Sequence, residues 1–83
     1  MKPADVRARI RQLIATEELP CESGCDIWAG QGTGRSCAGC GGTIGSANLE
    51  FEVELPRSKR VVLFHRECHS IWEDECRRLG HQA

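Results

Sequence analysis

Four residues in this chain have the types and the spacing of a metal site. Cys37 and Cys40 are separated by two residues, and His65 and Cys68 are separated in the same way farther along the chain. Two intervening residues let a tight turn or a helical turn direct both side chains toward one ion. Thiolate sulfur and imidazole nitrogen are the ligands that zinc prefers in structural sites. The pattern therefore predicts that these four residues bind one Zn²⁺ ion.

Glycines surround the first pair of predicted ligands. Gly39, Gly41 and Gly42 flank Cys40, and they allow the backbone to wrap round the ion and to present amides to thiolate sulfur. His65 and Cys68 are three residues apart, so the first turn of a helix can present both from one face. Four protein ligands leave no position for a reactive water molecule. We therefore expect a structural site and no enzyme activity.

Length and composition indicate one small domain that needs a cross-link. The chain has 83 residues, with nine glycines, two Trp, two Phe and no Tyr. A domain of this size buries too little apolar surface to depend on its core alone. Neither a signal-peptide core nor an apolar membrane span stands out, so we expect a cytoplasmic protein with no membrane association. That compartment favours metal binding over a Cys37–Cys40 disulfide, which is the alternative.

The pattern of apolar residues predicts helices at both ends of the chain. Residues 3–19 carry Val6, Ile10, Leu13 and Ile14 at helical spacing, and Pro20 should end this amphipathic helix. We expect the helix to pack on the domain, and a detachable helix that binds a partner is the alternative. A second helix should run from about His65 to Leu79, with Cys68, Ile71, Trp72 and Leu79 on its inner face.

A glycine-rich linker and a β-hairpin are predicted between the helices. Residues 20–36 are rich in glycine and poor in apolar residues, so we expect irregular backbone there. Leu49, Phe51, Val53 and Leu55 alternate with Glu50, Glu52 and Glu54, which is typical of a strand with one buried and one solvated face. A turn with basic residues leads to a second strand over residues 61–64. The segment 37–80 should thus form one module.

The predicted order of loop, hairpin and helix, with the second ligand pair where the helix begins, resembles the treble-clef zinc finger. The C-x2-C and H-x2-C pairs, and the aromatic Phe64 just before His65, are similar to the first half of a LIM domain. The chain also resembles short bacterial proteins of unassigned function. This resemblance implies an α+β fold stabilised by zinc. The chain departs from the LIM pattern after Cys68, because only one further cysteine, Cys76, follows.

Three cysteines and two histidines remain outside this set. Cys21 and Cys25 have a spacing that suits a second metal, with further ligands from His69, Cys76 or His81. Ordinary buried thiols are the favoured alternative, and a reactive Cys21–Cys25 pair is a third. His69 is expected to be solvated, or to replace His65 as ligand. Trp72 should join the core. Trp28 is equally consistent with docking of the linker and with partner binding.

Two function classes fit this sequence. The net charge of −1, from 11 basic and 12 acidic residues, gives no overall attraction to nucleic acid and favours a small module that binds another protein. The alternative is a nucleic-acid-binding zinc finger that uses local groups of basic residues, such as Arg57, Lys59 and Arg60. Acidic residues in the neighbouring strand and in the last helix oppose that alternative.

Overall fold

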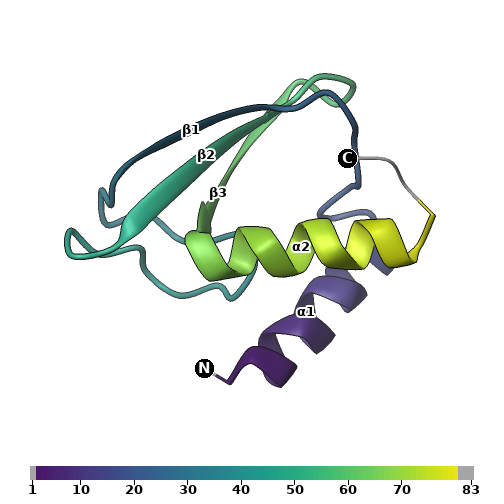
Figure 1. Ribbon diagram of the computed structural model, residues 1–83, viewed down its shortest axis with the longest axis horizontal. Coiled ribbons are helices and arrows are strands. Elements are labelled where there is room, and N and C mark those ends of the chain that lie inside the picture. The colour runs from purple at the N-terminus through teal and green to yellow at the C-terminus, as the bar shows by residue number, and fades with distance from the viewer. Residues whose placement is uncertain (1, 81–83) are drawn as a thin grey trace.

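The elements follow one another as helix, three strands and helix in the computed structural model, which describes residues 2–80 (Figure 1). They are α1 (Pro3–Ala15), β1 (Asp26–Gln31), β2 (Leu49–Leu55), β3 (Arg60–His65) and α2 (Arg66–Arg78). The strands form one antiparallel sheet in the order β1-β2-β3. This arrangement confirms the predicted α+β class. Neither helix of the described part is long and apolar enough to cross a membrane.

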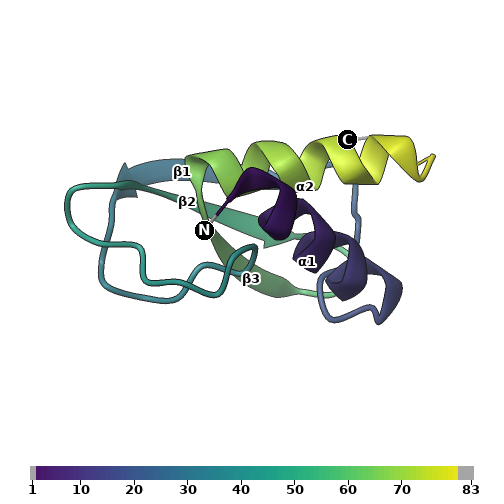
Figure 2. The same cartoon turned by 90° about the horizontal axis from the view of Figure 1, so that it is seen from below.

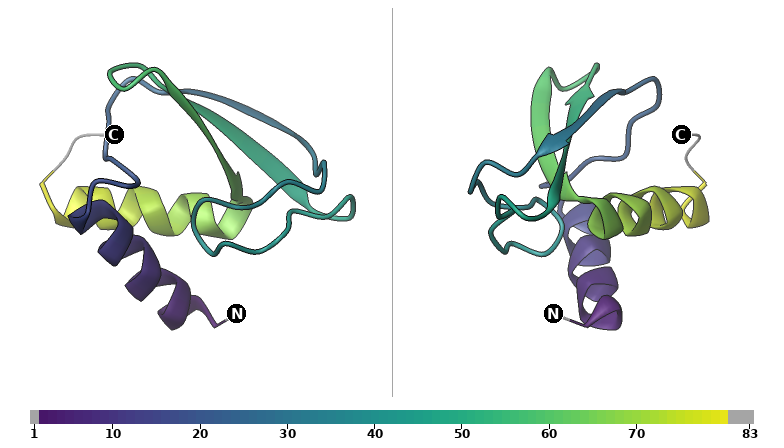
Figure 3. Two further views of the ribbon diagram at one scale, coloured as in Figure 1. Left: turned by 180° about the vertical axis from the view of Figure 1, so that it is seen from behind. Right: turned by 60° about the vertical axis from the view of Figure 1, so that its left-hand side comes forward.

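The two helices lie on the same side of the sheet. α2 begins where β3 ends and runs back below the strands, and α1 crosses below α2 (Figures 1 and 2). Views from behind and from the side show the same order of sheet, α2 and α1 (Figure 3). The hydrophobic core therefore lies between the inner face of the sheet and the helices.

The β2–β3 hairpin forms as predicted and supplies the core with its large side chains. Phe51 pairs with Phe64 and Val53 pairs with Val62 across the two strands. Val53 and Phe64 are fully buried, and Trp72 of α2 stacks on Phe64 with 5.3 Å between ring centroids. The predicted place of Trp72 in the core is confirmed.

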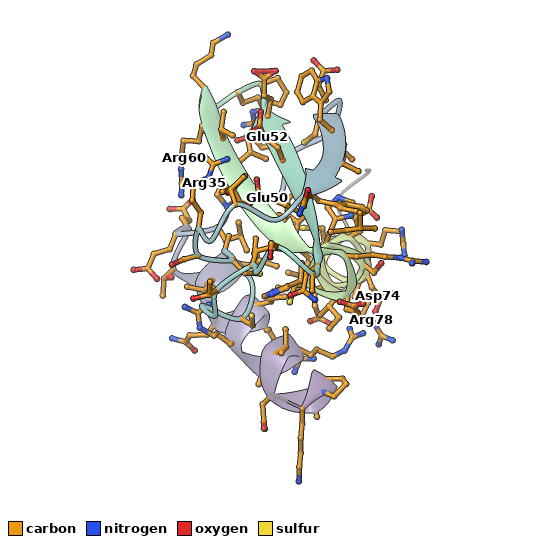
Figure 4. All side chains as sticks on the ribbon, turned by 90° about the vertical axis from the view of Figure 1, so that its left-hand side faces the viewer. Arg35, Glu50, Glu52, Arg60, Asp74 and Arg78 are labelled. Atoms are coloured by element: carbon orange, nitrogen blue, oxygen red, sulfur yellow. A yellow bond between two sulfur atoms is a disulfide. The ribbon has the colours of Figure 1, made fainter. Side chains whose placement is uncertain are left out.

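The predicted alternation of buried apolar and solvated acidic residues along β2 fails at its first two residues. Leu49 is 48% exposed, whereas Glu50 is only 6% exposed. The loop before β2 covers this end of the outer face, where Thr33 Oγ1 donates to Glu50 at 2.7 Å and Arg35 pairs with it at 3.1 Å (Figure 4). The prediction that Glu50 is solvated is therefore wrong, because a distant loop supplies its hydrogen-bond donors.

The expectation of irregular backbone across residues 20–36 is wrong for residues 26–31, which form β1. This strand pairs with β2 from Asp26 opposite Glu54 to Gln31 opposite Leu49. All six of its residues are exposed, so no buried face produced an apolar pattern in the sequence. The strand ends where Gly32 approaches Gly45, since an added Cβ would lie 2.0 Å from the Gly45 carbonyl oxygen. Backbone pairing alone therefore defines β1.

The N-terminal helix packs on the domain, as predicted, although it ends at Ala15 and not near Leu19. Val6 and Ile10 of α1 are buried in the core. Arg7 pairs with Asp74 at 2.7 Å and with Glu75, and Arg11 pairs with Glu75 at 2.9 Å. Apolar burial and charge pairing thus fasten α1 to α2.

The C-terminal helix ends as predicted, but its buried face differs toward the end. Gly80 has a φ of +89°, the left-handed conformation that glycine adopts readily. Leu79 is exposed, contrary to the prediction, and Glu75 and Cys76 are buried in the preceding turn. The core thus ends one helical turn earlier than the apolar pattern indicates.

A disulfide joins the segment after α1 to α2. Cys21 is bonded to Cys76, with 5.7 Å between their Cα atoms. Next to it, the buried Glu22 carboxylate accepts hydrogen bonds from the backbone N–H groups of Arg57, at 2.6 Å, and Ser58, at 3.2 Å. The sequence-based alternatives of free thiols, a metal ligand or a Cys21–Cys25 pair are therefore wrong for Cys21 and Cys76.

Removing this disulfide should lower stability without changing the fold. Its cysteines are 55 residues apart, and a disulfide typically stabilises a small domain by about 2–4 kcal/mol. We expect a Cys21→Ser, Cys76→Ser double variant to show that loss in chemical denaturation. Cys25→Ser is the control and should change stability little. Equal stability of the double variant and the unmodified protein would contradict the assignment.

The ion pair at Glu75 should make stability depend on pH. Hydrogen bonds from Arg11 and Arg7 outweigh the effect of burial and lower the pKa of Glu75 below its ordinary 4.5. The stabilisation from the ion pairs of Glu75 is therefore complete at pH values above the ordinary pKa of 4.5, and it is lost as the pH falls through the lowered pKa of the folded state. Glu75→Gln should destabilise the protein by about 1–2 kcal/mol at pH 7. The difference between variant and original should shrink when denaturation is repeated between about pH 5 and pH 2; a constant difference would contradict this explanation.

Candidate metal centre

The structure brings all four predicted ligands together. One ligand atom from each of Cys37, Cys40, His65 and Cys68 lies within 4.8 Å of every other. The first pair comes from the loop between β1 and β2, and the second pair from the junction of β3 and α2. Cys37 and Cys68 are buried, whereas Cys40 and His65 are half-buried. The chain thus contains a Cys3His cluster able to hold a metal ion.

The His65 ring is oriented for coordination through Nδ1. This atom lies 3.4 Å from Cys40 Sγ and 4.0 Å from Cys68 Sγ. Two such ligands on a tetrahedral ion, with bonds of zinc length, would be about 3.6 Å apart. The opposite ring nitrogen, Nε2, lies 3.1 Å from the Thr43 carbonyl oxygen. A hydrogen bond donated by Nε2–H leaves the Nδ1 lone pair free for the ion.

Backbone amides stabilise negative charge on the sulfur atoms. The N–H groups of His65 and Gly42 donate to Cys37 Sγ and Cys40 Sγ, each at 3.3 Å. A hydrogen bond with the Cys68 thiol, assisted by backbone amides, lowers the pKa of Cys37 to about 4. The same bond raises the pKa of Cys68. Metal binding needs deprotonated thiols, so it would release the protons that the cluster cysteines still carry.

The loop that carries Cys37 and Cys40 folds back on itself. Cys37 N–H donates to the Gly42 carbonyl at 2.8 Å, and Gly41 N–H donates to the Cys37 carbonyl at 2.9 Å. Gly41 has a φ of +78°, a conformation that costs little only for glycine. At Gly39 an added Cβ would lie 2.8 Å from Cys68 Cβ. Glycine therefore lets the loop and the first turn of α2 approach closely enough to share one ion.

The N-terminal helix also supports the centre. Arg9 Nη1 donates to the carbonyl oxygens of Gly39, at 2.7 Å, and Ala38, at 3.2 Å. The Ala38 N–H donates to the Leu63 carbonyl of β3 at 2.6 Å. Sequence reasoning identified neither Arg9 nor Thr43, because a contact with a distant carbonyl leaves no local pattern.

His69 does not belong to the cluster. Its side chain is buried, so the expectation of a solvated residue is wrong, and its ring packs against Phe51, Phe64 and Trp72. Its Nδ1 faces Glu73 at 3.6 Å, and its Nε2 has no hydrogen-bond partner within the described part of the chain. His69 is therefore an aromatic core residue.

No second metal cluster is present in residues 2–80. The disulfide occupies Cys21 and Cys76, and His81, the remaining candidate, lies outside the described residues. Cys25 keeps a free thiol that donates to the Glu22 carbonyl oxygen at 3.3 Å. Burial raises the pKa of the Cys25 thiol, which disfavours the reactive thiolate of a redox pair.

Comparison of the chain with protein-family models, curated proteins and solved structures finds no match.

The two histidines should differ in their effect on metal content. His65→Ala removes a ligand that faces three sulfur atoms, so we expect it to abolish stoichiometric metal binding. His69→Ala should retain one ion per chain even though it opens a cavity in the core. Elemental analysis of purified, folded material checks both. Loss of the ion from His69→Ala, with retention in His65→Ala, would reverse the assignment.

Proposed function

We propose that the Cys3His cluster binds one Zn²⁺ ion and that the ion has a structural role. The observation that carries this proposal is the convergence of three sulfur atoms and His65 Nδ1 within 4.8 Å. Sulfur and imidazole suit zinc, and four protein ligands complete its tetrahedral coordination. Because no position is left for water, the centre is not catalytic.

The treble-clef resemblance supports the same role. A loop with the first ligand pair, a hairpin and a helix that begins with the second pair follow in the order of that fold. In such a module the ion fastens the loop to the helix, so the fold becomes dependent on metal. The additional strand β1 and helix α1 extend this arrangement.

We propose further that the module binds another protein. Trp28 and Ile27 are 52% and 43% exposed on the strand farthest from β3. These two side chains flank the same strand edge from opposite faces, and large exposed apolar side chains are typical of protein-binding surfaces. The near-zero net charge is consistent with this role.

Nucleic-acid binding is the less favoured role, because carboxylates engage many of the arginines. These paired arginines are Arg7, Arg11, Arg35, Arg77 and Arg78. Figure 4 shows two such pairs, Arg35 with Glu50 and Arg78 with Asp74. An arginine that already has a carboxylate partner contributes less to phosphate attraction.

Metal dependence provides the direct test of the structural role. We expect purified protein to contain one zinc ion per chain and to lose its dispersed NMR spectrum on chelation, because zinc binding supplies folding free energy. Cys37→Ser should lose the ion, and Cys25→Ser, which alters a free cysteine outside the cluster, should keep it. A metal-free chain whose spectrum is unaffected by chelator would contradict the proposal.

The choice between protein binding and nucleic-acid binding has a separate test, which measures nucleic-acid affinity directly. Fluorescence anisotropy with labelled duplex DNA, single-stranded DNA and RNA should show no binding beyond weak, salt-sensitive association. Submicromolar binding that persists at physiological salt would favour the nucleic-acid alternative instead.

A further inference from the structure

One side of the β1 backbone has no partner among residues 2–80. Gly32 N–H donates to the Asn48 carbonyl oxygen at 3.0 Å, and alternate residues of an antiparallel strand make such bonds. The register therefore turns the backbone groups of Trp28 and Gly30 toward β2, and those of Ile27, Ala29 and Gln31 toward the open edge. No described residue hydrogen-bonds to these edge groups. An added strand can pair with such an edge.

The two faces beside this edge differ in chemistry. Ile27 and Ala29 lie opposite Val53 and Phe51, which face the helices, so this inner face is apolar. Trp28 lies opposite Glu52, and Asp26 lies opposite Glu54, on the outer face. Figure 4 shows Glu52 farther along β2 than Glu50, beyond the part of the sheet covered by Arg35.

The carboxylates of the open outer face lack cationic partners. Asp26, Glu52 and Glu54 form no ion pair with any residue in the described range 2–80. By contrast, the buried Glu50 and Glu75 are both paired with arginine. Three unpaired carboxylates beside the exposed Trp28 ring favour a cationic ligand, since ammonium and guanidinium groups bind both carboxylates and indole faces.

We propose that the β1 edge binds an extended segment of another protein in which basic residues alternate with apolar ones. The segment would pair with the backbone of Ile27, Ala29 and Gln31. Its basic side chains would lie over Trp28 and the acidic outer face, and its apolar side chains would lie beside Ile27. Because the occupant is a protein segment, this proposal depends on the interaction role proposed above.

Charge argues against two other occupants. A second copy paired edge to edge would place two sets of Asp26, Glu52 and Glu54 on one continuous face, which like-charge repulsion disfavours. Nucleic-acid phosphates would meet the same carboxylates. Of these three occupants, only a basic strand can both pair with the open backbone and be attracted to the carboxylates.

A capped octapeptide that alternates lysine with valine serves as the probe. Titrated into the zinc-loaded chain, it should shift the ¹⁵N-HSQC signals of residues 26–31 and slow hydrogen exchange at the amides of Ile27, Ala29 and Gln31. Binding should weaken as salt rises. The same peptide with glutamate in place of lysine should not bind.

Matched variants separate backbone pairing from side-chain contacts. Ala29→Pro removes an N–H that faces the open edge and should weaken binding about 10-fold or more, whereas Ala29→Val keeps this N–H and should change affinity less than about 3-fold. Trp28→Ala and Glu52→Gln should each weaken binding about 3- to 10-fold. Glu67→Gln, which neutralises an exposed carboxylate on α2, is the charge control and should have no effect.

Several results would overturn the proposal. These are equal binding of the glutamate peptide, no binding of the lysine peptide, equal affinity of Ala29→Pro and Ala29→Val, or concentration-dependent dimerisation that protects the same amides without peptide. Each can occur while the chain still holds one zinc ion, so the structural role would stand. Failure to take up zinc would instead contradict the structural part of the proposed function.

Discussion

Two chain segments that share no strand pairing with each other meet at the Cys3His cluster. The loop bearing Cys37 and Cys40 is irregular, and it is joined to β3 by single hydrogen bonds such as that from Ala38 N–H to the Leu63 carbonyl oxygen. A structural zinc ion supplies about 10–16 kcal/mol of binding free energy in small domains, which is comparable to the whole stability of a typical domain, about 5–15 kcal/mol. If the cluster holds zinc as proposed, this one coordination sphere dominates the stability of the fold.

The loop bearing Cys37 and Cys40, called the metal loop below, and the N-terminal region are both connected to α2. Its first turn carries Cys68 of the cluster, and its later turns carry Glu75, which pairs with α1, and Cys76, which is bonded to Cys21. These links fasten the metal loop, α1 and the segment after α1 to one helix. Arg9 then connects α1 back to the metal loop. A short chain with four aromatic residues thus replaces a large core with specific cross-links.

Two groups of carboxylates in the chain have different consequences. Glu22, Glu50 and Glu75 are buried, and each accepts hydrogen bonds from backbone amides, a hydroxyl or arginine, so they fasten loops and helices. Such satisfied buried groups also restrict how the segments can pack. Asp26 and Glu54 are exposed and belong to the strands beside the open edge. These two carboxylates are among the groups that we propose attract a basic segment.

The features that depend on local spacing can be predicted from the sequence without the fold. The two pairs of the Cys3His cluster, the β2–β3 hairpin, the two helices and the left-handed Gly80 follow from periodicity, C-x2-C-type spacing and glycine placement, because each of these patterns lies within a short stretch of chain. The Cys21–Cys76 bond, the burial of Glu50 and His69, and the contacts of Arg9 become visible only in the folded chain. These depend on which distant segment covers a residue. The sequence pattern also failed to predict β1. An exposed edge strand is defined by backbone hydrogen bonds, which every residue except proline can make, so it leaves no side-chain signal.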